Sequence, residues 1–166
     1  MNIEFLKRLL LFLGLLVAQV LVLNHIHLFG YAVPLLYIYF VISSRRNYPR
    51  WAILVWSFLL GLGVDVSSNT PGLAAASMTL MGLLQPYALE LFVQRDSNDD
   101  LQPAICNLGP TRYLSYAAML TGGYCLVFFT LESFTFFNWL HWLLSVTTST
   151  ALTLLLVMVI DNLRKQ

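Results

Sequence analysis

The chain of 166 residues is strongly apolar: 58% of its residues are hydrophobic, only 10% are charged, and its mean hydropathy is +0.74. A soluble domain carries roughly 25% charged residues, because charged side chains cover its surface. The composition excludes an ordinary cytosolic domain and a disordered chain and, with a formal net charge of only +1, a nucleic-acid binder. Cys106 and Cys125 belong to no metal-binding motif, so neither a disulfide nor structural zinc is expected. A small integral membrane protein remains.

Charged residues divide the chain into apolar runs of about the 20 residues that a membrane helix needs. The first run follows Lys7 and Arg8, as in a signal peptide, but no small-residue cleavage site comes after it, so we expect it to be retained. We predict an all-α, polytopic membrane protein in which residues 1–166 form a single domain of six transmembrane helices. The predicted helices cover residues 9–24, 28–43, 51–64, 72–89, 113–131 and 139–160.

The basic residues indicate how these helices are oriented. With six helices, both termini, the loop between helices two and three and the loop between helices four and five share one side of the membrane. Those regions hold all nine basic residues, which by the positive-inside rule puts both termini in the cytoplasm. They are Lys7, Arg8, Arg45, Arg46, Arg50, Arg95, Arg112, Arg164 and Lys165.

Asp65 is the residue that most suggests a functional site. The 14 residues between Arg50 and Asp65 give about 21 Å of helix, which is short of the roughly 30 Å hydrocarbon core. An ionisable group at such a depth is a functional-site hypothesis. The structural alternative, which we favour, is that the helix ends early and Asp65 lies in a wet vestibule, where it helps to satisfy the first amides of the next helix.

The residues after Asp65 predict a turn and a closely packed helix. Residues 67–69 read as a loop, Thr70 as an N-cap, and Pro71 as the first helical residue. Small residues then recur at helical spacing, which favours close packing against the same chain over a seam for another protein. These residues are Gly72, Ala75 or Ala76, Thr79 and Gly82, and Pro86 is expected to kink the same helix.

Polar groups elsewhere predict neither catalysis nor metal binding. His25, His27, His141 and Glu132 fall near the outer side, but on separate connections. The sequence holds no motif for a nucleophile elbow, a phosphate loop, a zinc protease or a dinucleotide turn, so we predict no catalytic, cofactor-binding or metal-ligating residue. We expect the hydroxyls of the last run to bond within their helix or to a neighbour rather than to line a substrate path. They are Ser145, Thr147, Thr148, Ser149, Thr150 and Thr153.

Residues 61–65, Gly-Leu-Gly-Val-Asp, are followed after six residues by Gly-Leu-Ala-Ala at 72–75. This pattern resembles the G-L-x-x-D…G-L-x-A signature of the MreD family, the bacterial rod shape-determining membrane proteins. The length and the six predicted helices agree with that family over essentially the whole chain. Residues 132–134 and the hydroxyl-rich last run resemble its Bacteroidota version. The polar loop at residues 67–70 departs from the pattern, since many relatives have a glycine there.

The resemblance implies a non-enzymatic inner-membrane subunit of the cell-wall elongation complex. Its expected partners are MreC, the RodA glycosyltransferase and its transpeptidase partner directly or through MreC, and the actin-like MreB filament indirectly. It also implies a fold similar to the six-helix substrate-binding subunits of vitamin transporters. Gly61, Leu62, Asp65 and Gly72 are the matching positions, and Asp65 and Gly72 are expected to shape the outer end of helices three and four, where a partner could dock. The alternatives are a small-molecule-binding subunit of such a transporter and, third, a membrane enzyme.

Overall fold

The computed structural model describes residues 3–21, 34–70, 72–93, 102–133 and 139–164. Within these ranges the chain is helical, without a strand, as the sequence predicts. The elements are α1 (Ile3–Leu21), the 3-10 helix η2 (Leu36–Ile38), α2 (Tyr39–Ile42), α3 (Arg50–Ser68), α4 (Leu73–Phe92), α5 (Ile105–Leu108), α6 (Pro110–Glu132) and α7 (Trp139–Arg164).

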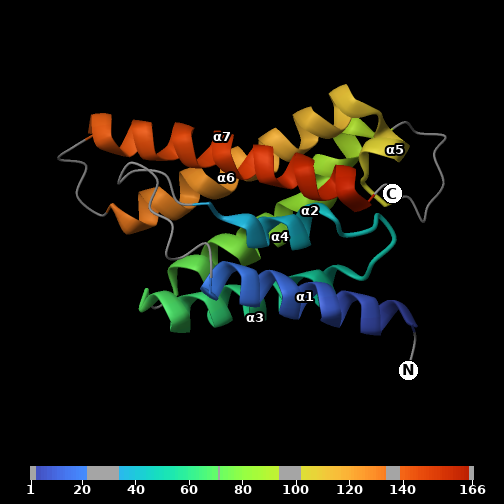
Figure 1. Cartoon of the computed structure of the whole chain (residues 1–166), viewed down its shortest axis with the longest axis horizontal. Helices are drawn as coiled ribbons and strands as arrows, with labels where there is room; N and C mark the ends of the chain where they lie inside the picture. Colours follow the sequence, from blue (N-terminus) through green and yellow to red (C-terminus); the bar gives the residue numbers. More distant parts are fainter. Residues whose placement is uncertain (1–2, 22–33, 71, 94–101, 134–138, 165–166) are drawn as a thin grey trace.

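The long helices run lengthwise on either side of a short central segment (Figure 1). Helix α3 packs against α4, α4 against α6, and α6 against α7, while α1 lies beside α3. The segment of η2 and α2 lies between the pair α1 and α3 and the pair α6 and α7, and it contacts α1, α4 and α7. The start of α1 and the end of α7 lie at the same end of the molecule, at the right in Figure 1.

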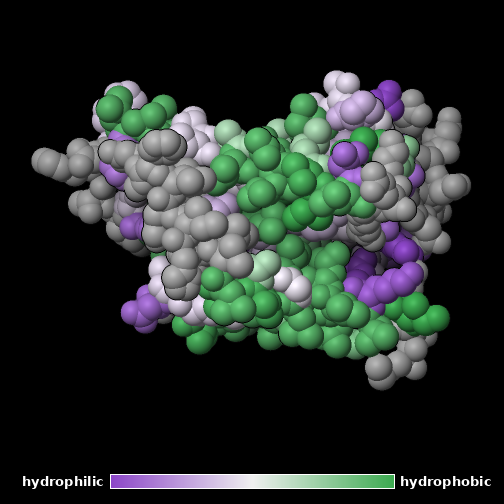
Figure 2. Space-filling view, viewed as in Figure 1, coloured by the Kyte–Doolittle hydropathy of each residue, from purple (hydrophilic) through white to green (hydrophobic). Residues whose placement is uncertain are grey.

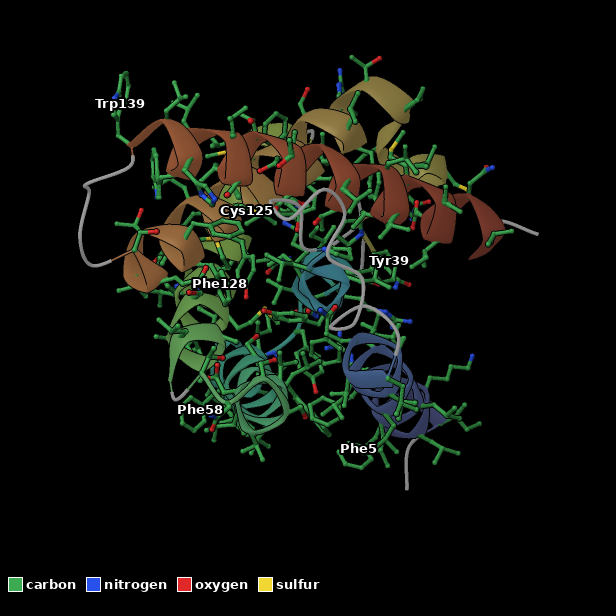
Figure 3. All side chains as sticks on the ribbon, turned by 60° about the vertical axis from the view of Figure 1, so that its left-hand side comes forward. Phe5, Tyr39, Phe58, Cys125, Phe128 and Trp139 are labelled. Carbon is green, nitrogen blue, oxygen red and sulfur yellow. The ribbon has the colours of Figure 1, made fainter. Side chains whose placement is uncertain are left out.

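The central segment is the core of the fold. Every residue from Leu35 to Ile42 is at most 7% exposed, because this run is apolar on all sides and long helices surround it. Figure 3 shows Tyr39 among the helices, whereas Phe5, Phe58 and Trp139 lie at the periphery. The last three are each at least 45% exposed, and apolar atoms cover much of the face in Figure 2. Burying polar and exposing apolar side chains suits a lipid environment.

Three of the described helices are long and apolar enough to cross a membrane, namely α3, α6 and α7. The prediction of six spans is not confirmed. Of the predicted helix at 28–43, residues 28–33 lie outside the described ranges. In the described part, only the seven residues of η2 and α2 are helical. The third predicted helix was expected to stop before Asp65, which is wrong: α3 continues to Ser68.

The contact between α3 and α4 depends on Gly61. A Cβ atom at this position would lie 2.5 Å from the Cα of Ala75 and 2.7 Å from the carbonyl oxygen of Ala74. Both of these atoms belong to the backbone of α4, so a side chain at position 61 would push the two helices apart. Gly82 makes a second close approach, since a Cβ there would lie 2.9 Å from the Ser57 hydroxyl.

We expect Gly61→Ala to lower the free energy of unfolding by about 1–3 kcal/mol, because the added methyl group overpacks a backbone contact. Gly14→Ala is the matched control: a Cβ there meets no atom within 4 Å, and alanine in a helix interior is better than glycine by roughly 0.5–1 kcal/mol. Unfolding in mixed detergent micelles measures both. Equal effects of the two substitutions would contradict the close α3–α4 contact.

Candidate functional site

Asp65 joins the end of α3 to the start of α4. Its carboxylate accepts hydrogen bonds from the backbone N–H of Ala74 to Oδ1 (2.8 Å) and of Ala75 to Oδ2 (2.9 Å), and from the Thr70 hydroxyl (3.1 Å). Its own carbonyl accepts the amides of Asn69 and Thr70, which closes α3. One residue thus satisfies backbone groups at two helix ends that would otherwise lack partners.

The expected capping role of Asp65 is confirmed, but two details of the prediction are wrong. Asp65 is only 3% exposed, so it does not lie in a wet vestibule. The residue before α4 is Gly72, while Thr70 donates to Asp65 instead of capping the helix directly. Pro71 lies outside the described residues. The carboxylate takes the capping role because its two oxygens reach two successive amides, which a single hydroxyl cannot do.

The structure brings three of the four predicted site residues together. Gly61 allows α4 to approach, Asp65 bonds to its first turn, and Gly72 leads the chain into it with φ of +86°, a conformation that favours glycine. Leu62 is 36% exposed on the surface of α3. We call Gly61, Asp65 and Gly72, with the residues they contact on α4, the α3–α4 junction.

We expect Asp65→Ala to lower the free energy of unfolding by about 2 kcal/mol or more, because two buried amides lose their partner and each costs about 1–3 kcal/mol. Asp65→Asn should have a smaller effect, since its one carbonyl oxygen still accepts one amide. Hydrogen exchange at Ala74 and Ala75 should accelerate in both variants. Ser67→Ala is the control, because the Ser67 hydroxyl bonds to Gly63 of its own helix. Unchanged exchange at both amides would contradict the capping role.

A second group of buried polar side chains holds the start of the central segment. The Gln19 side chain on α1 donates to the carbonyl of Pro34 (3.0 Å) and accepts the amide of Leu36 (3.1 Å). The Thr153 hydroxyl on α7 accepts the amide of Leu35 (3.1 Å). The non-helical backbone before η2 is therefore bonded to two helices that lie far apart in the sequence.

The end of the central segment is held in the same way. Tyr116 donates to the carbonyl of Ile42 (3.2 Å), and Gln85 donates to the carbonyl of Ser44 and to the Tyr116 hydroxyl (3.1 Å each). Gln102 donates to the Ser43 hydroxyl (3.2 Å). This network connects α4 and α6 to the chain that leaves α2.

Asp161 performs a related function near the end of α7. It accepts the amide of Ile105, the first residue of α5, at 2.8 Å and the Tyr39 hydroxyl at 3.2 Å. It is 4% exposed. A hydrogen bond between the hydroxyls of Tyr37 and Tyr124 further connects η2 to α6.

Sequence reasoning missed most of these polar residues. No role is predicted from the sequence for Gln19, Gln85 or Asp161. The sequence does indicate that these residues matter, because a polar side chain inside an apolar run must find a hydrogen-bond partner when it is buried. Their partners were not available, because they come from segments up to 122 residues away.

The hydroxyl groups of the last predicted run behave mostly as expected. Thr147, Thr148 and Thr150 bond to carbonyls of their own helix, and Thr153 bonds to a neighbouring segment. Within the described ranges, no group of three His, Cys, Asp or Glu side chains could hold a metal ion. His25 and His27 lie outside those ranges.

Comparison with known proteins finds no match for this chain. No family model matches this chain, and neither a curated protein nor a solved structure does. The class that the structure itself defines is an all-helical protein with helices long and apolar enough for a membrane.

Proposed function

We propose that this protein is a non-enzymatic, multi-pass subunit of the bacterial cell-wall elongation complex, of the MreD type, in the inner membrane. The observation that carries the proposal is the α3–α4 junction. Three of the four residues that match the family's signature serve one physical purpose, since Gly61, Asp65 and Gly72 together determine how two helices meet.

The distribution of charge supports cytoplasmic termini within this proposal. Lys7 and Arg8 lie in the second turn of α1, Arg45 and Arg46 follow α2, and Arg112 lies in the first turn of α6. These elements begin or end where both termini lie (Figure 1). The α3–α4 junction would then face the periplasm, with exposed Ser67, Ser68 and Asn69.

This arrangement suits a platform for other membrane proteins. A turn built from buried hydrogen bonds presents a fixed surface, and a fixed surface reduces the ordering cost of binding. MreC, a single-span protein with a large periplasmic part, is the proposed direct partner. RodA and its transpeptidase would be reached directly or through MreC, and MreB indirectly.

The native cysteine Cys106 tests the orientation. It is exposed on α5, at the end proposed to be cytoplasmic, whereas Cys125 is buried. A membrane-impermeant maleimide should therefore label Cys106 in inside-out vesicles but not in spheroplasts. Ser67→Cys in a Cys106→Ser background should give the opposite result, because Ser67 lies at the far end of α3. Labelling of Cys106 in spheroplasts would contradict cytoplasmic termini.

Capture of the tagged full chain from its native membrane in mild detergent tests the function. We expect MreC, with RodA or the transpeptidase, to accompany it, and Asp65→Asn and Gly72→Leu to lose most of the captured MreC and the rod shape of the cells. Thr147→Ala, which removes an exposed hydroxyl bonded within α7, should retain both. Recovery of ATPase subunits and a coupling protein instead would contradict the proposal and indicate a substrate-binding transporter subunit. Variants are compared at equal amounts of folded protein.

A further inference from the structure

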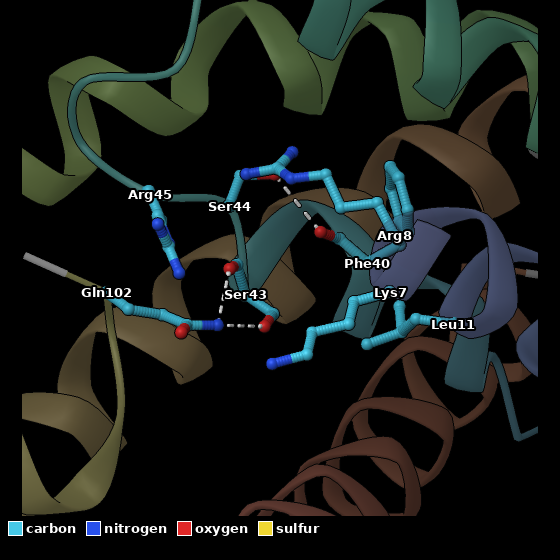
Figure 4. A pocket seen from close by; sticks show the side chains of 8 residues that line it. All are labelled: Lys7, Arg8, Leu11, Phe40, Ser43, Ser44, Arg45 and Gln102. Atoms are coloured by element: carbon cyan, nitrogen blue, oxygen red, sulfur yellow. Dashed lines mark hydrogen bonds between the residues drawn. The ribbon is translucent and has the colours of Figure 1, made fainter. Parts of the chain in front are cut away.

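A basic pocket lies at the end of the molecule opposite the α3–α4 junction. It is formed by the first turns of α1, the end of α2 and Gln102, and Lys7, Arg8 and Arg45 line it. Its volume of about 70 Å³ is several times what one water molecule requires, so it has room for a phosphate group. Figure 4 shows the Lys7 side chain reaching toward the side of the pocket where Arg45 and Gln102 lie.

Cationic side chains make up a large part of the pocket lining. Three of its eight lining residues are cations, and none of the eight is acidic. The guanidinium of Arg8 lies 3.5 Å from the centre of the Tyr48 ring, which fixes its position beside the pocket. The Gln102 amide donates to Ser43 and forms part of the same wall. Such a group of cations is suited to the oxygens of a phosphate.

Apolar surface adjoins this basic group. Leu11 and Phe40 line the same pocket, and on α1 the exposed Leu6 and Leu10 flank it in the sequence. On the face drawn in Figure 2, hydrophilic atoms lie in a recess between apolar surfaces at the end where α1 begins. A ligand that carries both a phosphate and a hydrocarbon chain fits this combination better than a fully soluble anion.

We propose that this pocket binds the phosphate of an anionic phospholipid, with Lys7, Arg8 and Arg45 around the headgroup and the acyl chain along α1. Basic pockets between membrane helices on the cytoplasmic side are suited to anionic headgroups. The ends of α1 and α2 are where the headgroups of that leaflet would lie. The site depends on residence in the membrane and not on any partner protein, so its test is independent of the function proposed above.

The test is calorimetric titration of the purified full chain, in neutral detergent, with short-chain phosphatidylglycerol. Lys7→Gln/Arg45→Gln should weaken the affinity about 25-fold, since each cation near an anionic headgroup contributes about fivefold. The matched control Arg46→Gln/Arg112→Gln removes the same charge outside the pocket and should change the affinity little. Both double variants are first checked for the unfolding behaviour of the parent protein.

Two further ligands identify the source of the phosphate. Phosphatidylcholine with the same acyl chains should bind more weakly, because its headgroup carries no net charge. Inorganic phosphate at equal concentration should fail to displace phosphatidylglycerol, because it makes no apolar contact with Leu11 and Phe40. Displacement by inorganic phosphate would assign the pocket to a soluble anion and overturn the proposal. An equal loss of affinity for phosphatidylglycerol in the two double variants would also overturn the proposal, because the attraction would then come from the overall charge of the protein and not from the pocket.

Discussion

Hydrogen bonding of buried backbone at the breaks between helices is the constraint on which this structure depends. A buried amide or carbonyl that finds no water and no protein partner costs free energy, so each break between helices needs a partner from the protein. Asp65 supplies it for α4, Gln19 and Thr153 for η2, and Asp161 for α5. All four side chains are at most 4% exposed, which makes these polar residues part of the core.

This constraint also couples packing to capping. Asp65 reaches the amides of Ala74 and Ala75 only because Gly61 lets the backbone of α4 come close. A larger residue at position 61 would therefore weaken the hydrogen bonds at position 65 as well as the helix contact. The effects of substitutions at positions 61 and 65 on the free energy of unfolding should therefore not add, as expected for residues in one contact network. The short central segment depends in the same way on α1, α4, α6 and α7, which bond to its two ends.

The two ends of the molecule differ in chemistry, and this difference suits two kinds of contact. The α3–α4 junction carries a small neutral turn held from within, which suits specific docking by a protein. The opposite end carries Lys7, Arg8 and Arg45 beside apolar side chains, which suits an anionic headgroup. Under the two proposals, the first contact would orient the protein toward a partner, and the second would hold it at a fixed depth in the bilayer.

The sequence by itself determined the helical class, the position of the long apolar helices and the capping role of Asp65, because hydropathy, charge and turn residues act over short distances. It did not determine the broken central segment, since Leu35 to Ile42 are as apolar as any membrane helix. It also did not reveal the partners of Gln19, Gln85 and Asp161. These are decided by tertiary structure, because a buried polar group needs a partner but its own sequence does not specify which distant segment supplies it.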